Sequence, residues 1–211
     1  MLNIIFDFDG TLADSFDLIV QIFYSMTKRA EPLSSKEMDR LRELPLRRIF
    51  QEVGVKMWRV PYLYRKGKSM MAKHINELNL IPEIEETLDK LREDNKLFII
   101  SSNSASNINQ FLKLKRIDKY FTGVMGGAGI TGKKRVINKM IRRYKLDRRN
   151  SFYVGDETRD IEAAHKSHVK SIAVTWGFSP EKTLKKVKPY AIANKPQDIA
   201  GITRTFVAKA K

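Results

Sequence analysis

The sequence predicts an α/β fold, a doubly wound parallel sheet with an inserted all-helical domain. The chain begins with a short apolar run that ends in two aspartates, as a buried parallel strand with a functional edge would. From residue 82 onward, short apolar runs alternate with amphipathic helical patterns, which is typical of a parallel sheet. Residues 12–80 instead show helical patterns without strand alternation. A chain of 211 residues, 42% hydrophobic and 30% charged, is long and apolar enough to bury such a core.

The first predicted strand covers residues 2–6 and runs directly into Asp7 and Asp9, followed by Gly10 and Thr11. Residues two apart on a strand point to the same side, so the strand end presents two carboxylates together. Such a pair is costly in a buried site unless it holds a cation or shares a proton. Active sites of parallel sheets lie at this carboxyl edge, so the first strand predicts a catalytic site.

The remaining elements follow in order. Residues 12–80 predict helices with breaks near Glu31-Pro32, Gly54 and Pro61. The later part of the chain predicts helices at 83–93, 105–115, 134–145 and 158–166, strands at 97–100, 123–125, 151–154, 171–174 and 191–193, and a terminal helix. We therefore expect a Rossmann-like core made of residues 1–13 and 82–211, and a helical cap made of residues 14–81.

Polar residues follow further strands at the same predicted edge. They are Ser101, Ser102 and Asn103 after strand 97–100, Gly155, Asp156 and Asp160 after strand 151–154, and Lys133 at the start of a basic helix. Phosphoryl transfer from a monoester needs this set: a carboxylate to attack phosphorus and a second to protonate the leaving oxygen. It also needs a hard cation such as Mg²⁺ on oxygen ligands, and a hydroxyl and a lysine for the phosphate oxygens.

The ordered motifs Asp7-Phe8-Asp9-Gly10-Thr11, Ser101, a downstream lysine and Gly155-Asp156-x-x-x-Asp160 resemble the four motifs of the haloacid dehalogenase superfamily. Within it, the chain is similar to phosphoglycolate phosphatase-like hydrolases, whose helical cap follows the first strand. The resemblance implies a Mg²⁺-dependent phosphatase that acts on a small phosphomonoester, phosphoglycolate-like or a sugar phosphate, through an aspartyl-phosphate. A carboxylate at Asp9 is evidence against the dehalogenase reaction, which needs no leaving-group acid.

The resemblance also implies a role for each motif residue. Asp7 is expected to be the nucleophile, and Asp9 the general acid/base that also gives its backbone carbonyl to the metal. Gly10 and Thr11 form the turn beside the phosphate, and Ser101 binds a phosphate oxygen with Ser102 and Asn103 nearby. Lys133 bridges the nucleophile and the phosphate, and Asp156 coordinates Mg²⁺. Asp160 completes the metal-site set of Asp7, Asp9, Asp156 and Asp160, orienting metal-bound water or the lysine.

Three alternatives stay open at this point. Lys134 could replace Lys133, although Lys133 directly follows Gly132 and precedes the apolar pair Val136-Ile137. Arg47, with neighbouring arginines of the cap, could bind an acidic group on the leaving side, or could be exposed helix charge. A sugar-phosphate mutase uses the same core and differs chiefly in its cap contacts.

The chain is strongly basic, with 40 Lys and Arg against 24 Asp and Glu and a formal charge of +16. The densest run, residues 133–149, holds nine basic residues and one acid. It predicts either a solvated helix face or a polyanion-binding surface, so a nucleic-acid-binding protein acting on polynucleotide ends is the alternative from another class. The absence of cysteine, of a 20-residue apolar run and of a basic-then-apolar start favours a cytoplasmic protein without membrane contact. The sequence gives no indication of the oligomeric state.

Overall fold

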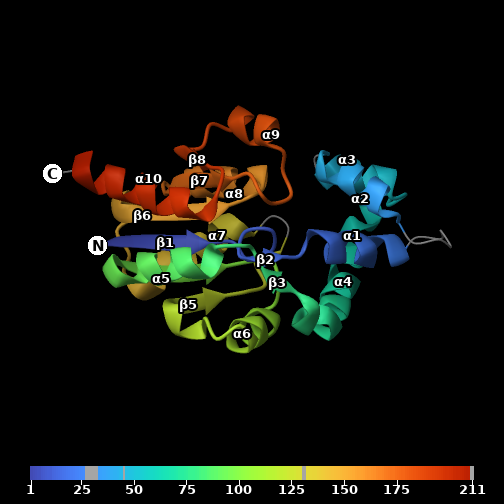
Figure 1. Cartoon of the computed structure of the whole chain (residues 1–211), viewed down its shortest axis with the longest axis horizontal. Helices are drawn as coiled ribbons and strands as arrows, with labels where there is room; N and C mark the ends of the chain where they lie inside the picture. Colours follow the sequence, from blue (N-terminus) through green and yellow to red (C-terminus); the bar gives the residue numbers. More distant parts are fainter. Residues whose placement is uncertain (27–32, 45, 130–131, 210–211) are drawn as a thin grey trace.

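The computed structural model describes residues 1–26, 33–44, 46–129 and 132–209. Its centre is a six-stranded sheet in the order β5-β4-β1-β6-β7-β8, in which every neighbouring pair is parallel (Figure 1). The strands are β1 (Leu2–Phe6), β4 (Asn95–Ile100), β5 (Phe121–Met125), β6 (Ser151–Gly155), β7 (Lys170–Val174) and β8 (Ala191–Ala193). The apolar β1 is central because strands cover both its edges and helices cover both its faces, which confirms the predicted fold class.

Helices pack on both faces of this sheet. One face carries α5 (Ile84–Asp94), α6 (Ala105–Leu114) and α10 (Pro196–Lys209), and the other carries α7 (Lys133–Tyr144), α8 (Thr158–His165) and α9 (Glu181–Lys186). Alternate residues of β1 point to opposite faces, so Ile4 and Phe6 join the core under α5 and α6 while Ile5 joins the core under α7. The sheet is therefore buried on both sides, and only its edges are available for a site.

The insertion lies between two antiparallel two-residue strands, β2 (Ala13–Asp14) and β3 (Asn79–Leu80). Its helices are α1 (Phe16–Ser25), α2 (Ser35–Arg42), α3 (Leu46–Glu52) and α4 (Val60–His74), with 3₁₀ turns at 57–59 and 75–77. Figure 1 shows them as a separate group beside the end of the sheet toward which β1 points. They enclose an apolar cluster of their own, which Phe178 joins from the core side. The cap therefore faces the carboxyl edge of the sheet.

The predicted elements of the core are confirmed, and their bounds agree within two residues. The predicted breaks near Gly54 and Pro61 are confirmed, because α3 ends at Glu52 and α4 begins at Val60. Pro61 lies in the first turn of α4, where a missing N–H costs nothing. The strands β2 and β3 were not predicted because two residues are too short to show alternation, and α9 was not predicted either. The predicted break at Glu31-Pro32 lies outside the described residues.

No helix within the described ranges is long and apolar enough to span a bilayer. The exact boundaries of cap and core stay a prediction.

Candidate active site

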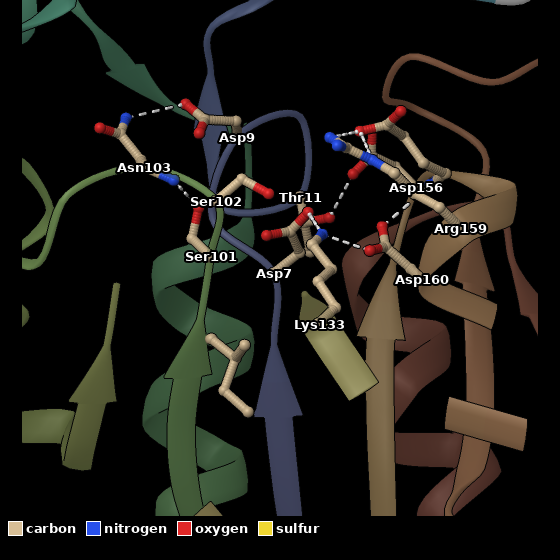
Figure 2. Close-up of polar contacts among 12 residues, drawn as sticks. Asp7, Asp9, Thr11, Ser101, Ser102, Asn103, Lys133, Asp156, Arg159 and Asp160 are labelled. Carbon is tan, nitrogen blue, oxygen red and sulfur yellow. Dashed lines mark hydrogen bonds and ion pairs between the residues drawn. The ribbon is translucent and has the colours of Figure 1, made fainter. Parts of the chain in front are cut away.

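Asp7 and Lys133 meet at the end of β1. The Asp7 amide donates to the Val154 carbonyl at 2.8 Å, which fixes the residue directly after the strand. Lys133, the first residue of α7, is buried and places Nζ 2.5 Å from Asp7 Oδ2, and it also pairs with Asp160 Oδ1 (Figure 2). Among the described residues, Asp7 Oδ1 has no hydrogen-bond partner although it is buried. The nucleophile candidate therefore has one oxygen held by a cation and the other free, while Lys134 is exposed.

Asp156, directly after β6, is held on both oxygens. Thr11 Oγ1 donates to Oδ1 at 2.7 Å, and the Phe178 amide donates to Oδ2 at 2.8 Å. Burial, followed by the nearby charge of Glu157, raises the pKa of Asp156 well above its usual value. Gly10, with φ +74°, approaches so closely that a Cβ there would lie 2.5 Å from Asp156 Oδ2. The site thus depends on a bare backbone at Gly10 in a conformation that glycine adopts without strain.

Asp160 lies in the first turn of α8 and positions the lysine. Its Oδ1 pairs with Lys133, and its Oδ2 accepts from the Glu157 amide at 3.2 Å. Glu157 in turn forms an ion pair with Arg159. Both oxygens of Asp160 are therefore already bonded to the chain, which favours its predicted role in orienting the lysine.

The site has more negative than positive charge, so it could bind a divalent cation. Four carboxylates, those of Asp7, Asp156, Glu157 and Asp160, stand against the two cations Lys133 and Arg159. Oxygen atoms of Asp7, Asp156 and Asp160 lie within 4.8 Å of one another. Burial raises the pKa of Asp7 to about 7, so the ionised cluster is unfavourable without a further positive charge. The all-oxygen donor set of Asp7, Asp156 and Asp160 fits Mg²⁺.

Asp9 points away from this cluster, toward Asn103 on the neighbouring strand end (Figure 2). Asn103 Oδ1 accepts from the Ser104 amide at 2.8 Å and from Asn107 Nδ2 at 3.0 Å, so its NH₂ group faces Asp9 Oδ1 at 3.4 Å. Burial raises the pKa of Asp9 to about 6, although the bond from Asn103 opposes the shift. A carboxyl with this pKa can both give and take a proton near neutral pH.

Ser101 and Ser102 follow β4, beside Asp7. Ser101 Oγ accepts from the Asn103 amide at 2.9 Å, and Ser102 Oγ donates to the Gly129 carbonyl at 2.8 Å. The structure therefore brings the predicted phosphate-binding residues Gly10, Thr11, Ser101, Ser102 and Asn103 to the same edge as Asp7. It does not test Arg47, whose side chain lies outside the described part of α3.

Two contacts of the site were not predicted. The sequence places Thr11 beside the phosphate, but its hydroxyl holds Asp156, and the second bond to Asp156 comes from the backbone of Phe178. Nothing in the pattern of side chains could have identified a backbone donor 22 residues away. Arg159 was also missed, although its place three residues after Asp156 in the same motif was a usable signal.

The fold and site define an α/β enzyme with an acidic centre at the carboxyl edge, and the comparisons name its family. The family model for haloacid dehalogenase-like hydrolases matches residues 4–174, so the chain belongs to this family, as the motifs predicted. A phosphoglycolate phosphatase of Synechococcus elongatus is 33% identical over 202 residues, covering 94% of this chain and 95% of the relative. The pyrophosphatase PpaX of Oceanobacillus iheyensis is 26% identical and covers 95% of each chain. The solved structure of a haloacid dehalogenase-like protein from Streptococcus pneumoniae shares the fold, with a TM-score of 0.77, 24% identity and coverage of 96% and 98%.

Proposed function

We propose that this enzyme hydrolyses a small phosphomonoester with Mg²⁺, through a phosphoryl group carried by Asp7. The observation that supports this most directly is the state of the Asp7 carboxylate. Lys133 holds its Oδ2, while its buried Oδ1 has no partner among the described residues. An oxygen that is buried, desolvated and unpaired is poised to attack an electrophile.

In the first step, Asp7 attacks phosphorus and the bond from phosphorus to the leaving oxygen breaks. Asp9 gives its proton to that oxygen, so an alcohol leaves and an aspartyl-phosphate remains. In the second step, Asp9 takes a proton from water, the water oxygen bonds to phosphorus, and the bond between phosphorus and Asp7 breaks. Inorganic phosphate leaves and both carboxyl groups return to their initial states. The pKa of Asp9, near 6, suits both proton transfers.

The remaining residues of the site bind the phosphate and the metal ion or hold the catalytic side chains in position. Lys133 neutralises charge on Asp7 and the phosphate oxygens, with Asp160 fixing its position. Ser101, Ser102 and Asn103 lie where phosphate oxygens would bind. Asp7 and Asp156 would hold Mg²⁺, with the backbone carbonyl of Asp9 as the further predicted ligand and Asp160 alongside. When bound, the ion neutralises phosphate charge and aligns the ester with Asp7.

The substrate proposal draws on the relatives. Phosphoglycolate and pyrophosphate each have a second anionic group beside the phosphoryl group that is transferred, so we favour a substrate of this kind over a neutral sugar phosphate. The cap places an arginine near the site: Arg42, which forms an exposed ion pair with Asp17 at 2.8 Å, lies over the Phe16 ring at 4.6 Å. Phe16 in turn contacts Phe178, whose amide holds Asp156. Arg47 stays a candidate for the same role.

The test compares two variants on two leaving groups. Asp7→Asn should abolish phosphate release from every ester, because the attacking carboxylate is lost. In a single turnover, Asp9→Asn should slow the release of glycolate from phosphoglycolate by about 10²–10⁴, but should slow the release of nitrophenol from p-nitrophenyl phosphate much less, because that leaving oxygen needs no proton. Equal loss in this first step on both esters would contradict the role of Asp9 as the leaving-group acid. Folded wild-type protein that releases no phosphate with Mg²⁺ from any monoester would overturn the phosphatase proposal.

A further inference from the structure

A second hollow lies at the edge of the sheet opposite the catalytic site. It has a volume of about 430 Å³ and opens where β7 begins, whereas the catalytic residues follow the strand ends. Its polar lining residues are His165, His168, Lys170, Ser171, Lys188 and Tyr190. None of the described residues that line it is acidic. The two lysines and the lack of an acid among these lining residues therefore favour an anionic ligand over a cation.

The floor of the hollow is well ordered by its own contacts. The buried Ser171 Oγ lies 3.3 Å from His165 Nε2 and accepts from the Tyr190 amide at 3.4 Å. Tyr190 is 49% exposed, while edge contacts with Phe152 and Phe206, at ring distances of 5.6 and 6.2 Å, hold the ring. A fixed, half-exposed aromatic ring between lysines can stack on a base without much loss of side-chain freedom.

The hollow continues into the basic stretch that the sequence singled out. Lys170 Nζ donates to the Arg149 carbonyl at 2.5 Å, so the 3₁₀ turn at 148–150 borders the hollow. Arg148 donates to Asn138 of α7 at 2.8 Å and to the Ser167 carbonyl, which joins this turn to α7. On α7, Arg142 is four residues beyond Asn138 and therefore lies on the same side of the helix.

We name the set of Arg142, Lys145, Arg149, Lys170 and Lys188 the rear basic surface. The side chains of Arg142, Lys145, Arg149 and Lys188 are exposed, and that of Arg149 is 92% exposed. The nearest acid in the sequence, Asp147, accepts from the Arg149 amide and from Asn150 and makes only a 3.7 Å ion pair with the Arg149 side chain. The surface therefore keeps most of its positive charge.

We propose that the rear basic surface binds a single strand of nucleic acid, with one base on Tyr190 and successive phosphates on the cations. Spaced cations around one aromatic platform match a phosphodiester strand, since each phosphate needs one counter-charge and each base offers a stacking face. A lone small anion would use only the hollow and leave Arg142, Lys145 and Arg149 without a role. An anionic membrane would favour several exposed apolar side chains, whereas Tyr190 is the large exposed hydrophobic residue that lines the hollow.

The test measures the anisotropy of a labelled oligonucleotide of about 12 nucleotides, as a strand and as a duplex. If about four cations contact phosphates, log K against log salt should have a slope of about −3, which weakens binding roughly 50-fold between about 50 and about 200 mM salt. The charge-reversed pair Arg149→Glu/Lys188→Glu should weaken strand binding at least about ten-fold and make the slope shallower by one to two. Tyr190→Leu keeps an apolar side chain in the hollow and should weaken binding about ten-fold by removing stacking.

The matched control is Lys36→Glu/Lys113→Glu, which changes the net charge equally at exposed positions on α2 and α6. It should retain binding within about three-fold, and circular dichroism confirms that all variants fold. An equal loss in both charge pairs would show general attraction and overturn the proposal. Four other results would also overturn the proposal: no binding at low salt, duplex binding as tight as strand binding, full competition by equimolar tripolyphosphate, or a preference for phosphatidylserine vesicles. Because none of these residues lies in the catalytic site, phosphatase activity should be unchanged in every variant.

Discussion

At the scale of single residues, Lys133 joins the nucleophile candidate to the acid of the last motif. It is buried between Asp7 and Asp160, and their charges raise its pKa well above the usual value although burial opposes this. A buried ion pair gives little net stability as a whole, but removing one partner leaves an uncompensated charge. The lysine therefore contributes to the stability of the folded state as well as to the proposed chemistry.

We expect Lys133→Met to lower the free energy of unfolding by about 3–5 kcal/mol, because two buried carboxylates lose their cation. Lys134→Met, next to it on the exposed side of α7, should change that free energy by less than about 0.5 kcal/mol. Urea denaturation in the presence of a chelator measures both values. Equal effects of the two substitutions would contradict the buried pairing and reopen the alternative of Lys134.

Much of the site at this scale could be predicted from the sequence, because Asp7, Asp9, Ser101 and Asp156 are adjacent to apolar strands. In a parallel sheet, the residues that directly follow each strand lie at the same edge. The alternation of strands and helices in the sequence therefore predicts that these residues share one edge of the sheet. The bond from the Phe178 amide to Asp156 could not be predicted, because it depends on the path of the loop after β7. No side-chain pattern encodes a backbone donor.

At the scale of elements, that loop between β7 and α9 decides how Asp156 is held. Gly177 lies against Asp156, and a Cβ at this position would come within 2.3 Å of the Asp156 Cβ atom. Trp176 fixes the same loop to the first motif by donating from Nε1 to the Thr11 carbonyl at 3.2 Å. The loop therefore joins the nucleophile turn, the metal-site acid and, through Phe178, the cap.

We expect Gly177→Ala to push Asp156 aside, lowering the free energy of unfolding by about 1–3 kcal/mol and weakening Mg²⁺ binding. Gly201→Ala is the matched change within α10, where nothing lies within 4 Å of the added Cβ, and it should stabilise by about 0.5–1 kcal/mol. Thermal unfolding with and without Mg²⁺ separates the two. An unchanged Mg²⁺ response in Gly177→Ala would show that this loop does not position Asp156.

The sequence predicted long, periodic elements better than short ones. Helix α7 could be located to one residue at each end because Val136, Ile137, Met140 and Ile141 form one apolar face. The six-residue α9 and the two-residue strands β2 and β3 are too short for either period to be visible. Pro61 marked a helix boundary correctly, because proline is tolerated in the first turn of a helix but not in its interior.

At the scale of the whole molecule, acidic and basic side chains gather at opposite edges of the sheet. The carboxyl edge gathers acids around Asp7, while the opposite edge holds the rear basic surface. The sequence showed the excess of +16 and its densest run, but not that Lys170 contacts Arg149 and lines one hollow with Lys188, since this depends on the order of β6, β7 and β8. Separation of the two surfaces is a property of the sheet topology.

The acidic edge should make stability depend on pH and on Mg²⁺ together. Burial raises the pKa of Asp7 from 3.8 to about 7 and that of Asp9 to about 6. A carboxyl whose pKa is higher in the folded state binds protons more tightly there than in the unfolded chain, so its contribution is lost as pH rises from about 4 to about 7. We therefore expect the Tm of the metal-free protein to fall across this range.

Mg²⁺ should reverse this loss, because it binds the ionised carboxylates that protons no longer neutralise. The rise in Tm on adding Mg²⁺ should be larger at about pH 7.5 than at about pH 5. At a hundred-fold excess of Mg²⁺ over Kd, the free energy of unfolding should increase by about 2.7 kcal/mol. Asp156→Asn keeps one acceptor oxygen for the Phe178 amide, and its NH₂ group can donate to the Thr11 hydroxyl, but it removes a charge. It should therefore abolish most of the Mg²⁺ effect and raise the metal-free Tm at neutral pH. A Mg²⁺ response of equal size at both pH values, or in Asp156→Asn, would place the ion elsewhere on the protein. Because the readout is thermal unfolding, this result separates metal binding from catalysis, and it stands even where the preferred ester is unknown.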